Sequence, residues 1–276
     1  MCISDARLIC SKRAKEKEKM GWYNSGFDST NNAYDYDDKD KGPRRFWMPP
    51  EAEKRIIFLD ENPQTYWEHV FKHRGSWKNY EPCKIRNRMD NDCAVCERYP
   101  ESFPAFIGMF SIINLSIWEN NKGMQFCYGR ELFVAKLGGK EKPGVLKKME
   151  RLKKQNNGLT GCIFDVYRSG KKTESVGDEF TLIEKIEPRK LVEHGKGLIK
   201  EWVKKINENI SDPEKHYTLE KFWERNPWVP FNYEEILTFR SNEQLKEMFK
   251  LSGKDESSKE KDDSSNDNAL DDSAPY

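Results

Sequence analysis

Short apolar runs separated by turn-forming residues dominate the middle of this chain. The runs are rich in β-branched and aromatic residues, which suit the pleated surface of a strand, and Pro, Asp, Asn and Gly break them. The last two runs flank a Ser-Gly-Lys-Lys turn, which is typical of a β-hairpin. The pattern predicts about seven short strands, within the segments 44–49, 54–60, 64–71, 103–118, 124–129, 131–137, 159–168 and 178–186.

Helical spacing replaces the strand pattern in two parts of the chain. Val145, Met149 and Leu152 fall on one helical face, with a Pro near the start of their segment and a Gly after its end. After residue 188, apolar residues such as Trp202 and Ile206 recur at helical spacing. We interpret this later Trp and Phe stripe as core packing rather than as a surface for stacking bases. The predicted helices cover 143–158, 191–210, 212–227 and 232–251.

The stretch from His69 to Cys96 concentrates side chains that bind metal. It holds three of the seven cysteines and two of the four histidines. Cys93 and Cys96 form a CxxC pair, Cys83 lies upstream of them, and an imidazole lies further upstream. Three thiolates and one imidazole close a tetrahedral zinc site and leave no position for a catalytic water. The residues between these ligands are too polar to form a core, so one structural zinc per chain is expected to supply the folding energy.

Two histidines could supply the nitrogen ligand. His69 follows a strand-like run that would hold it rigidly, so it is preferred, while His73 lies between two cations and would face solvent or phosphate. A redox CxxC would open a helix after a buried strand, and a zinc deaminase would need a Glu two residues after the His. The sequence has neither pattern. Three unrelated reduced cysteines remain the alternative, although structural cysteines favour apolar burial.

Composition favours a soluble protein of a reducing compartment. Of the 276 residues, 34% are charged, the mean hydropathy is −0.95, and no apolar run approaches the length of a membrane span. The N-terminus lacks the apolar core of a signal peptide. Residues 254–276 carry eight acidic and three basic side chains, a net charge of −5. Subtracting them from 48 Lys and Arg and 47 Asp and Glu leaves 45 and 39, a net charge of +6, which is typical of a protein that binds a polyanion.

Aromatic residues and cations alternate closely in the predicted strands and in the metal loop. Single-stranded nucleic acid is bound by aromatic faces set beside cations, because its bases are unstacked and each nucleotide carries a phosphate. Ordinary strand composition and a solvated edge would explain about half of these residues equally well. The candidate DNA-binding residues are Arg44, Arg45, Trp47, Lys72, Trp77, Tyr80, Lys84, Arg86, Arg88, Phe126, Tyr128, Arg130, Tyr167 and Arg168.

The metal loop and the residues after it resemble a known family. The run His69-x-Phe71-Lys72-x-x-Gly75-x-Trp77, then Cys83, then Cys93-x-x-Cys96, is similar to the zinc subdomain of the single-stranded DNA-binding proteins of T-even-type bacteriophages. An apolar strand with Ile112, Asn114 and Leu115, and the acidic tail, extend the similarity. The chain departs from the family in a His-to-Cys loop that is one residue longer, in Ala94 where a Pro is usual, and in an N-terminal segment that does not match the one used for cooperative binding.

The resemblance implies an α+β fold in which the zinc loop is inserted into an OB-fold, the antiparallel barrel that the strand count also favours. His69, Cys83, Cys93 and Cys96 would then be the zinc ligands. The DNA would run between barrel and zinc subdomain, and the tail would contact replication and recombination proteins in the cytoplasm of an infected bacterium. Self-association along DNA would also be possible. The expected parts are a flexible basic arm at 1–43, the barrel at 44–187 with its zinc subdomain at about 66–100, helices packed on the barrel at 188–251, and a disordered tail at 252–276.

The expected function is to bind and coat single-stranded DNA with little sequence preference in phage DNA replication, recombination and repair. The alternative is a zinc-containing scaffold that recruits replication proteins, with its basic face used for protein contacts. An enzyme is not expected, because the sequence has no Gly-rich phosphate loop, no Ser/His/Asp set and no clustered acidic metal ligands.

Overall fold

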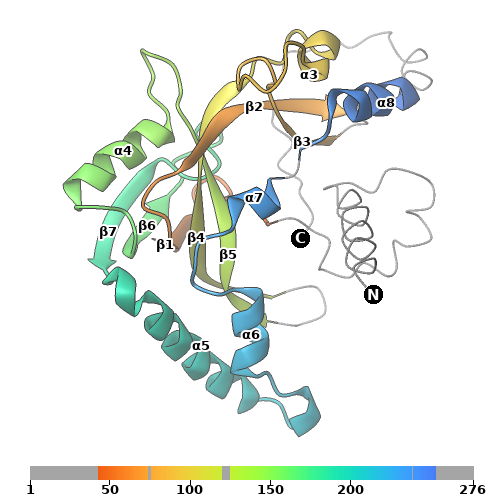
Figure 1. Ribbon diagram of the computed structural model, residues 1–276. Helices are drawn as coiled ribbons and strands as arrows, with labels where there is room; N and C mark the ends of the chain where they lie inside the picture. Colours follow the sequence, from red (N-terminus) through yellow and green to blue (C-terminus); the bar gives the residue numbers. More distant parts are fainter. Residues whose placement is uncertain (1–42, 74–75, 120–124, 238, 253–276) are drawn as a thin grey trace, which may run out of the picture. The chain divides into compact units, whose positions relative to one another are not determined.

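The computed structural model describes residues 43–73, 76–119, 125–237 and 239–252 (Figure 1). These residues form an α+β fold in two units. The metal unit comprises the described residues of 68–104 and 232–252, and the sheet unit comprises those of 43–67 and 105–231. The basic arm at 1–42 and the tail at 253–276 lie outside the described residues, so their predicted disorder stays a prediction.

Seven strands form an open antiparallel sheet. Their order is β3-β2-β4-β1-β6-β7, and β5 pairs with β4. The strands are β1 (Glu53–Phe58), β2 (Gln64–His73), β3 (Ser76–Pro82), β4 (Ala105–Glu119), β5 (Gln125–Lys136), β6 (Cys162–Tyr167) and β7 (Glu179–Lys185). The helices are α3 (Ala94–Arg98), α4 (Val145–Gln155), η3 (Pro188–Lys190), α5 (Leu191–Asn207), η4 (Pro213–Lys215), α6 (Leu219–Arg225), α7 (Tyr233–Ile236) and α8 (Asn242–Ser252).

Most predicted elements are confirmed, with several differences. The predicted helix 212–227 is the short η4 followed by α6, and the predicted helix 232–251 is two helices, α7 and α8. The segments 124–129 and 131–137 were predicted as two strands, but they form the single strand β5. This strand continues through Tyr128, although that residue has a positive φ of 50°. The segment 44–49 is no strand; Arg45 makes one isolated bridge to Leu132. Strand β3 and helix α3 were not expected. The pairings among the described residues form an open sheet, whereas the strand count had suggested a closed barrel.

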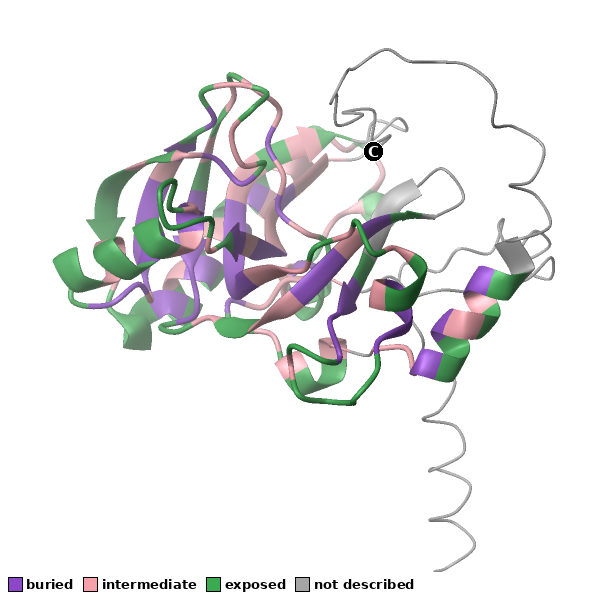
Figure 2. Ribbon diagram, turned by 90° about the horizontal axis from the view of Figure 1, so that it is seen from above, coloured by how far each residue is buried: buried purple, intermediate pink, exposed green. Residues whose placement is uncertain are grey.

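Strand β1 lies at the centre of the sheet unit because both of its faces are apolar. Side chains alternate along a strand, so Ile56 and Phe58 enter one cluster while Ile57 enters another. The ring of Phe58 meets the rings of Phe110 and Phe133 edge to face, with centroids 5.4 and 5.3 Å apart. Buried segments accordingly run through the central strands (Figure 2).

Helices cover both faces of the sheet unit. Val145 and Met149 of α4 pack into the cluster that contains Phe58. Leu191 of α5 packs with Ile57 and Trp228 on the other face. No described helix has the combination of length and hydropathy needed to span a bilayer.

The metal unit has a small apolar core that the sequence did not predict. Phe71 of β2 stacks on Tyr99 at 5.2 Å, and Phe249 of α8 meets both rings edge to face. Val95 and Leu245 are also buried. Helices α5 and α6 contribute Leu191 and Trp223 to a cluster with strand residues of the sheet unit, whereas α7 and α8, which were also predicted to pack on the strand core, belong to the metal unit.

Candidate metal centre and nucleic-acid contacts

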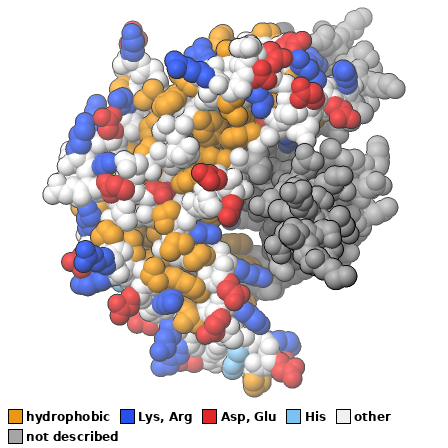
Figure 3. Space-filling view, viewed as in Figure 1, with side chains coloured by type: hydrophobic (Ala, Val, Ile, Leu, Met, Phe, Trp, Pro, Cys, Tyr) orange, Lys and Arg blue, Asp and Glu red, His pale blue; other side chains and the backbone are white. Residues whose placement is uncertain are grey.

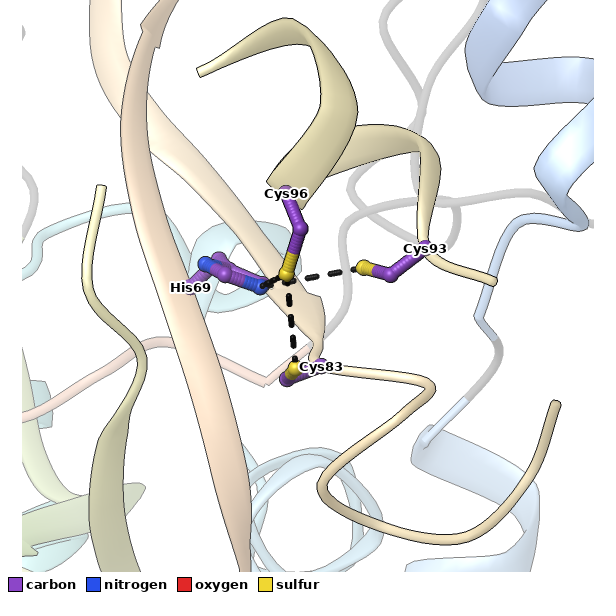
Figure 4. Close-up of side chains that lie close together, drawn as sticks. All are labelled: His69, Cys83, Cys93 and Cys96. Carbon is purple, nitrogen blue, oxygen red and sulfur yellow. Dashed lines mark hydrogen bonds between the residues drawn. The ribbon is translucent and has the colours of Figure 1, made fainter. Parts of the chain in front are cut away.

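Three adjoining elements place the four expected ligands together. His69 is on β2, Cys83 follows the end of β3, and Cys93 and Cys96 flank the start of α3. Cys93 has an extended backbone (φ −147°, ψ 111°) and the helix begins at the next residue, which turns the chain so that both CxxC sulfurs point to one place. All four side chains point toward one another (Figure 4).

Three separations among the four candidate ligand atoms are close to those around a tetrahedral metal. The Sγ atoms of Cys83 and Cys96 lie 3.7 Å apart, and Nε2 of His69 lies 3.7 Å from the Sγ of Cys93 and 3.3 Å from that of Cys96. Tetrahedral zinc, with bonds of ~2.3 Å to sulfur and ~2.0 Å to nitrogen, requires sulfur–sulfur separations of about 3.8 Å and sulfur–nitrogen separations of about 3.5 Å. All four ligand atoms lie within 4.8 Å of one another. The cluster could therefore hold a metal ion, and the choice between the histidines falls on His69.

A backbone carbonyl orients the imidazole. Nδ1 of His69 lies 2.8 Å from the carbonyl oxygen of Ser102, so Nδ1 carries the proton it donates and Nε2 keeps a lone pair facing the sulfurs. Metal-binding histidines commonly have such a partner, because it fixes the tautomer and the ring plane. The hydroxyl of Ser102 donates to the carbonyl of Val70, next to His69 in β2.

The thiols differ in acidity. Burial opposes the thiolate of Cys93, but the hydrogen bond with His69 and those from the backbone N–H groups of Cys96 and Lys84 outweigh burial and lower its pKa to about 6. Burial and the hydrogen bonds with Cys83 and Cys93 raise the pKa of Cys96 to about 12. Binding a cation would displace the proton of Cys96, as metal sites built on thiolates require.

Helix α8 holds the loop that leads into the CxxC pair. Nδ2 of Asn242, a buried residue, donates to both carboxylates of the loop, at 3.0 Å from Asp90 Oδ2 and 2.6 Å from Asp92 Oδ1. Its Oδ1 accepts from the N–H of Ala94 at 3.1 Å. Lys246 lies 3.2 Å from Asp92 Oδ2. Sequence reasoning missed these residues, because nothing near Asn242 in the chain points to a partner about 150 positions away.

Two predicted DNA-binding cations are buried. Arg168 is 3% exposed and donates to the carbonyl of Met48 at 2.6 Å, which ties the start of the sheet unit to the end of β6. Lys84 is 8% exposed beside Cys83. Both cations occupy the protein interior, so we remove them from the proposed DNA-contacting set.

Two further candidates lie half-buried in packed surroundings. The guanidinium of Arg130 lies 4.0 Å from the ring centre of Phe231 and donates to the carbonyl of Val229. The ring of Tyr128 packs against Trp228 with centroids 6.5 Å apart. Through these contacts, the two residues join β5 to the segment that follows α6.

The structure places the other candidates as follows. Arg86, Arg88, Lys72 and Arg44 are exposed, and Tyr80 and Tyr167 are 39% and 36% exposed. Arg45 and Trp47 are half-buried, and the side chain of Trp77 lies outside the described residues.

Arg44 and Phe126 both contact Trp118, which was not among the predicted DNA-binding residues. The rings of Trp118 and Phe126 stack with centroids 4.4 Å apart and an interplanar angle of 17°. The guanidinium of Arg44 lies 5.6 Å from the centre of the Trp118 ring and 3.6 Å from Glu131. Trp118 stands opposite Phe126 in the β4–β5 register, so the hairpin itself places the pair. We call Arg44, Trp118 and Phe126 the stacking cluster.

Charge does not gather in one patch on the surface drawn in Figure 3. Lys and Arg side chains are interspersed there with Asp and Glu. Local arrangements such as the stacking cluster therefore carry more information about a nucleic-acid contact than net charge does.

Comparisons with known proteins identify no relative. The chain matches no protein-family model, no curated protein and no solved structure.

Proposed function

We propose that this protein binds and coats single-stranded DNA with little sequence preference, and that the metal in the His69 cluster is a structural zinc. The stacking cluster carries the proposal, because it combines stacked, partly exposed aromatic faces with a cation at the end of a hairpin. Proteins that bind single strands without sequence preference use this combination, with each stacked base contributing ~1–3 kcal/mol.

The donor set supports zinc in a structural role. Three sulfurs and one nitrogen favour zinc among divalent metals, and four protein ligands leave no open position for chemistry. The metal would instead fix the ends of the loop between Cys83 and Cys93. On this proposal the protein is not an enzyme, and the β4–β5 hairpin that carries the stacking cluster supplies the DNA-contacting surface that an OB-fold barrel supplies in other proteins of this kind.

The wider biological role extends the proposal. Coating of single strands would serve phage DNA replication, recombination and repair in the cytoplasm of an infected bacterium. The acidic residues after 252 would recruit replication and recombination proteins, and copies of the chain could associate along the DNA. The resemblance at the metal loop and the opposite charges of tail and body support this role.

A titration of fluorescent oligo-dT, with poly-dA and duplex DNA as comparisons, tests the proposal. We expect binding to both single strands, weaker binding to duplex, and an affinity that falls with salt by ~0.7 in logarithmic slope per neutralised phosphate. Trp118→Ala should weaken binding by ~1–3 kcal/mol without changing this slope, because it removes a stacking face and no charge.

Trp223→Ala is the matched control. Trp223 also has a cation over its ring, with the Lys196 ammonium 5.2 Å from the ring centre, but it lies on α6. This variant should bind oligo-dT like the unmodified protein. Equal losses in the two variants, or no binding of the unmodified protein to single strands at low salt, would contradict the proposal.

The alternative function is a zinc-containing scaffold that recruits replication proteins. The exposed apolar side chains of Leu182 and Ile183 on the terminal strand β7 favour it, because strands at the end of a sheet can pair with another chain. A scaffold would give no oligo-dT binding with the salt dependence described above.

A further inference from the structure

The loop between Cys83 and Cys93 exposes apolar side chains beside a cation. Ile85 is 47% exposed and Met89 is 53% exposed. Together with Arg88, Asp90 and Asn91 they line a hollow of about 450 Å³. Ligand sites in proteins commonly have volumes of ~300–1,000 Å³, so the hollow is large enough to take one base.

The backbone holds this loop in one shape. Both the backbone N–H and the side-chain amide of Asn87 donate to the carbonyl of Cys83, at 3.0 and 2.8 Å. The N–H of Met89 donates to the carbonyl of Lys84 at 2.9 Å. Arg88 adopts a positive φ of 56°, which costs a residue with a Cβ about 1–2 kcal/mol. A charged side chain that stays exposed at such a position suggests a functional constraint.

Cations outnumber anions at the exposed surface of this loop once Lys246 of α8 is counted with it. The carboxylate of Asp90 accepts from the Asn242 side chain and from the N–H of Asn91, and that of Asp92 accepts from Asn242 and pairs with Lys246. Arg86 and Arg88 are exposed on the same loop. Arg86, Arg88 and Lys246 against Asp90 and Asp92 give this surface a net charge of +1, which favours an anionic partner.

We propose that this hollow, formed by Ile85, Arg88 and Met89, binds one unstacked base of single-stranded DNA and its phosphate. The flat apolar face of a base covers the side chains of Ile85 and Met89, while Arg88 pairs with the adjoining phosphate. The site lies in the metal unit and is separate from the stacking cluster. It rests on the proposed function and adds to it a second contact for the strand.

The base contact is tested with oligonucleotides that differ only in the presence of bases. Oligo-dT and an abasic oligonucleotide of the same length carry equal charge. The double variant Ile85→Ser/Met89→Ser should bind oligo-dT about tenfold more weakly, which corresponds to ~1.4 kcal/mol, and should bind the abasic strand like the unmodified protein. Leu182→Ser/Ile183→Ser is the matched control, because these residues of β7 are similarly exposed, at 40% and 45%. The control should leave both affinities unchanged.

The phosphate contact has its own variant. Arg88→Gly removes the cation and suits a positive φ, so the loop keeps its shape. We expect it to reduce the salt slope by ~0.7 for oligo-dT and for the abasic strand alike. Metal content and circular dichroism, measured on every variant, should match those of the unmodified protein.

The outcomes separate the two proposals. If the unmodified protein binds oligo-dT but the Ile85/Met89 variant binds both strands unchanged, the base site is wrong and single-strand binding stands. Equal weakening for both strands, or an equal loss in the β7 control, also overturns the base site. If the unmodified protein binds no single strand at low salt, both proposals fail. Binding of an acidic peptide with the same dependence on Ile85 and Met89 as oligo-dT would identify a protein partner instead and overturn the base site.

Discussion

Asn242 connects two parts of the sequence through one amide group. Its side chain donates to Asp90 and Asp92 and accepts from Ala94, and it is 4% exposed. Hydrogen bonds to charged partners contribute ~1.5–3 kcal/mol, and removal of one partner leaves the others buried and unsatisfied. The position therefore influences both the stability of the metal unit and the shape of the metal loop.

Asn242→Ala should destabilise the metal unit by about 2–4 kcal/mol and speed release of the metal to a coloured chelator. Thermal unfolding and the rate of chelation measure the two effects. Asn232→Ala is the control, because the exposed Asn232 only caps α7 by accepting from Glu234. The Asn232→Ala variant should lower the free energy of unfolding by about 0.5–2 kcal/mol and leave the rate of metal release unchanged. Equal release rates in the two variants would contradict a role of Asn242 at the metal loop.

Glu131 gives the sheet unit a defined dependence on pH. Burial raises its pKa, although the charges of Arg44 and Lys54 and a hydrogen bond from Asn114 oppose the shift. A carboxyl group whose pKa is higher in the folded state binds more protons there than in the unfolded chain. Its contribution to stability is therefore largest below the unfolded value of 4.5 and is lost as the pH rises through the folded value.

Glu131→Gln should remove this dependence and keep the hydrogen bond from Asn114. Urea midpoints measured from pH 4 to pH 8 should show that the unmodified protein loses stability relative to the variant as the pH rises. Other groups titrate in both proteins and cancel in the difference. Parallel curves would show that the pKa of Glu131 is not raised.

Helix α5 contains two glycines with opposite surroundings. A Cβ on Gly195 would overlap the ring of Trp228, whereas a Cβ on Gly197 would meet nothing within 4 Å. Trp228 is buried in the cluster between α5 and the sheet. Gly195 is therefore required for the close approach of the helix to this ring, while Gly197 lies at an open position.

Gly195→Ala should destabilise the sheet unit by about 1–3 kcal/mol through overpacking. Gly197→Ala should stabilise it by about 0.5–1 kcal/mol, because Ala loses less backbone entropy than Gly in a helix. Urea unfolding followed by tryptophan fluorescence measures both changes. The same sign for the two substitutions would mean that Trp228 does not limit the approach of α5.

The metal should stabilise its own unit more than the rest of the protein. Cys93→Ser removes one thiolate, so protein purified without added metal should hold less zinc by elemental analysis and the metal unit should unfold at a lower temperature. Cys127→Ala is the control, since Cys127 is buried in the sheet unit away from the cluster. It should retain one zinc per chain. A Cys93→Ser protein that holds zinc and melts unchanged would contradict the site.

At the scale of the whole molecule, the sequence predicts local features better than distant contacts. Spacing predicted the three cysteines of the candidate metal cluster, and the strand-like run before His69 favoured it over His73, so all four members were named within 28 positions. The strand segments followed from alternation, but their order did not, and the count suggested a barrel where the structure has an open sheet. Arg168 illustrates a second limit. Composition does not show whether a cation faces solvent or, like Arg168, is buried and hydrogen-bonded to another segment of the chain.

The acidic tail is opposite in charge to the rest of the molecule. Residues 254–276 carry a net charge of −5 and the remainder carries +6. Deleting the tail should tighten binding to short oligonucleotides, most clearly at low salt where charges are least screened. Changing its eight acidic residues to their amides should have the same effect at unchanged length. Equal affinities for the full and shortened proteins at low salt would rule out competition between tail and DNA.

The contact between Asn242 and the metal loop also sets an order of events during synthesis. Ala94 and Asn242 are separated by 148 positions. At about 5–20 residues per second, the cysteines leave the ribosome roughly 7 to 30 s before the helix that holds their loop. A nascent chain that binds a metal through these cysteines should thus retain it firmly only after α8 has been made. Chains truncated before α8 should release the ion faster than chains that contain this helix.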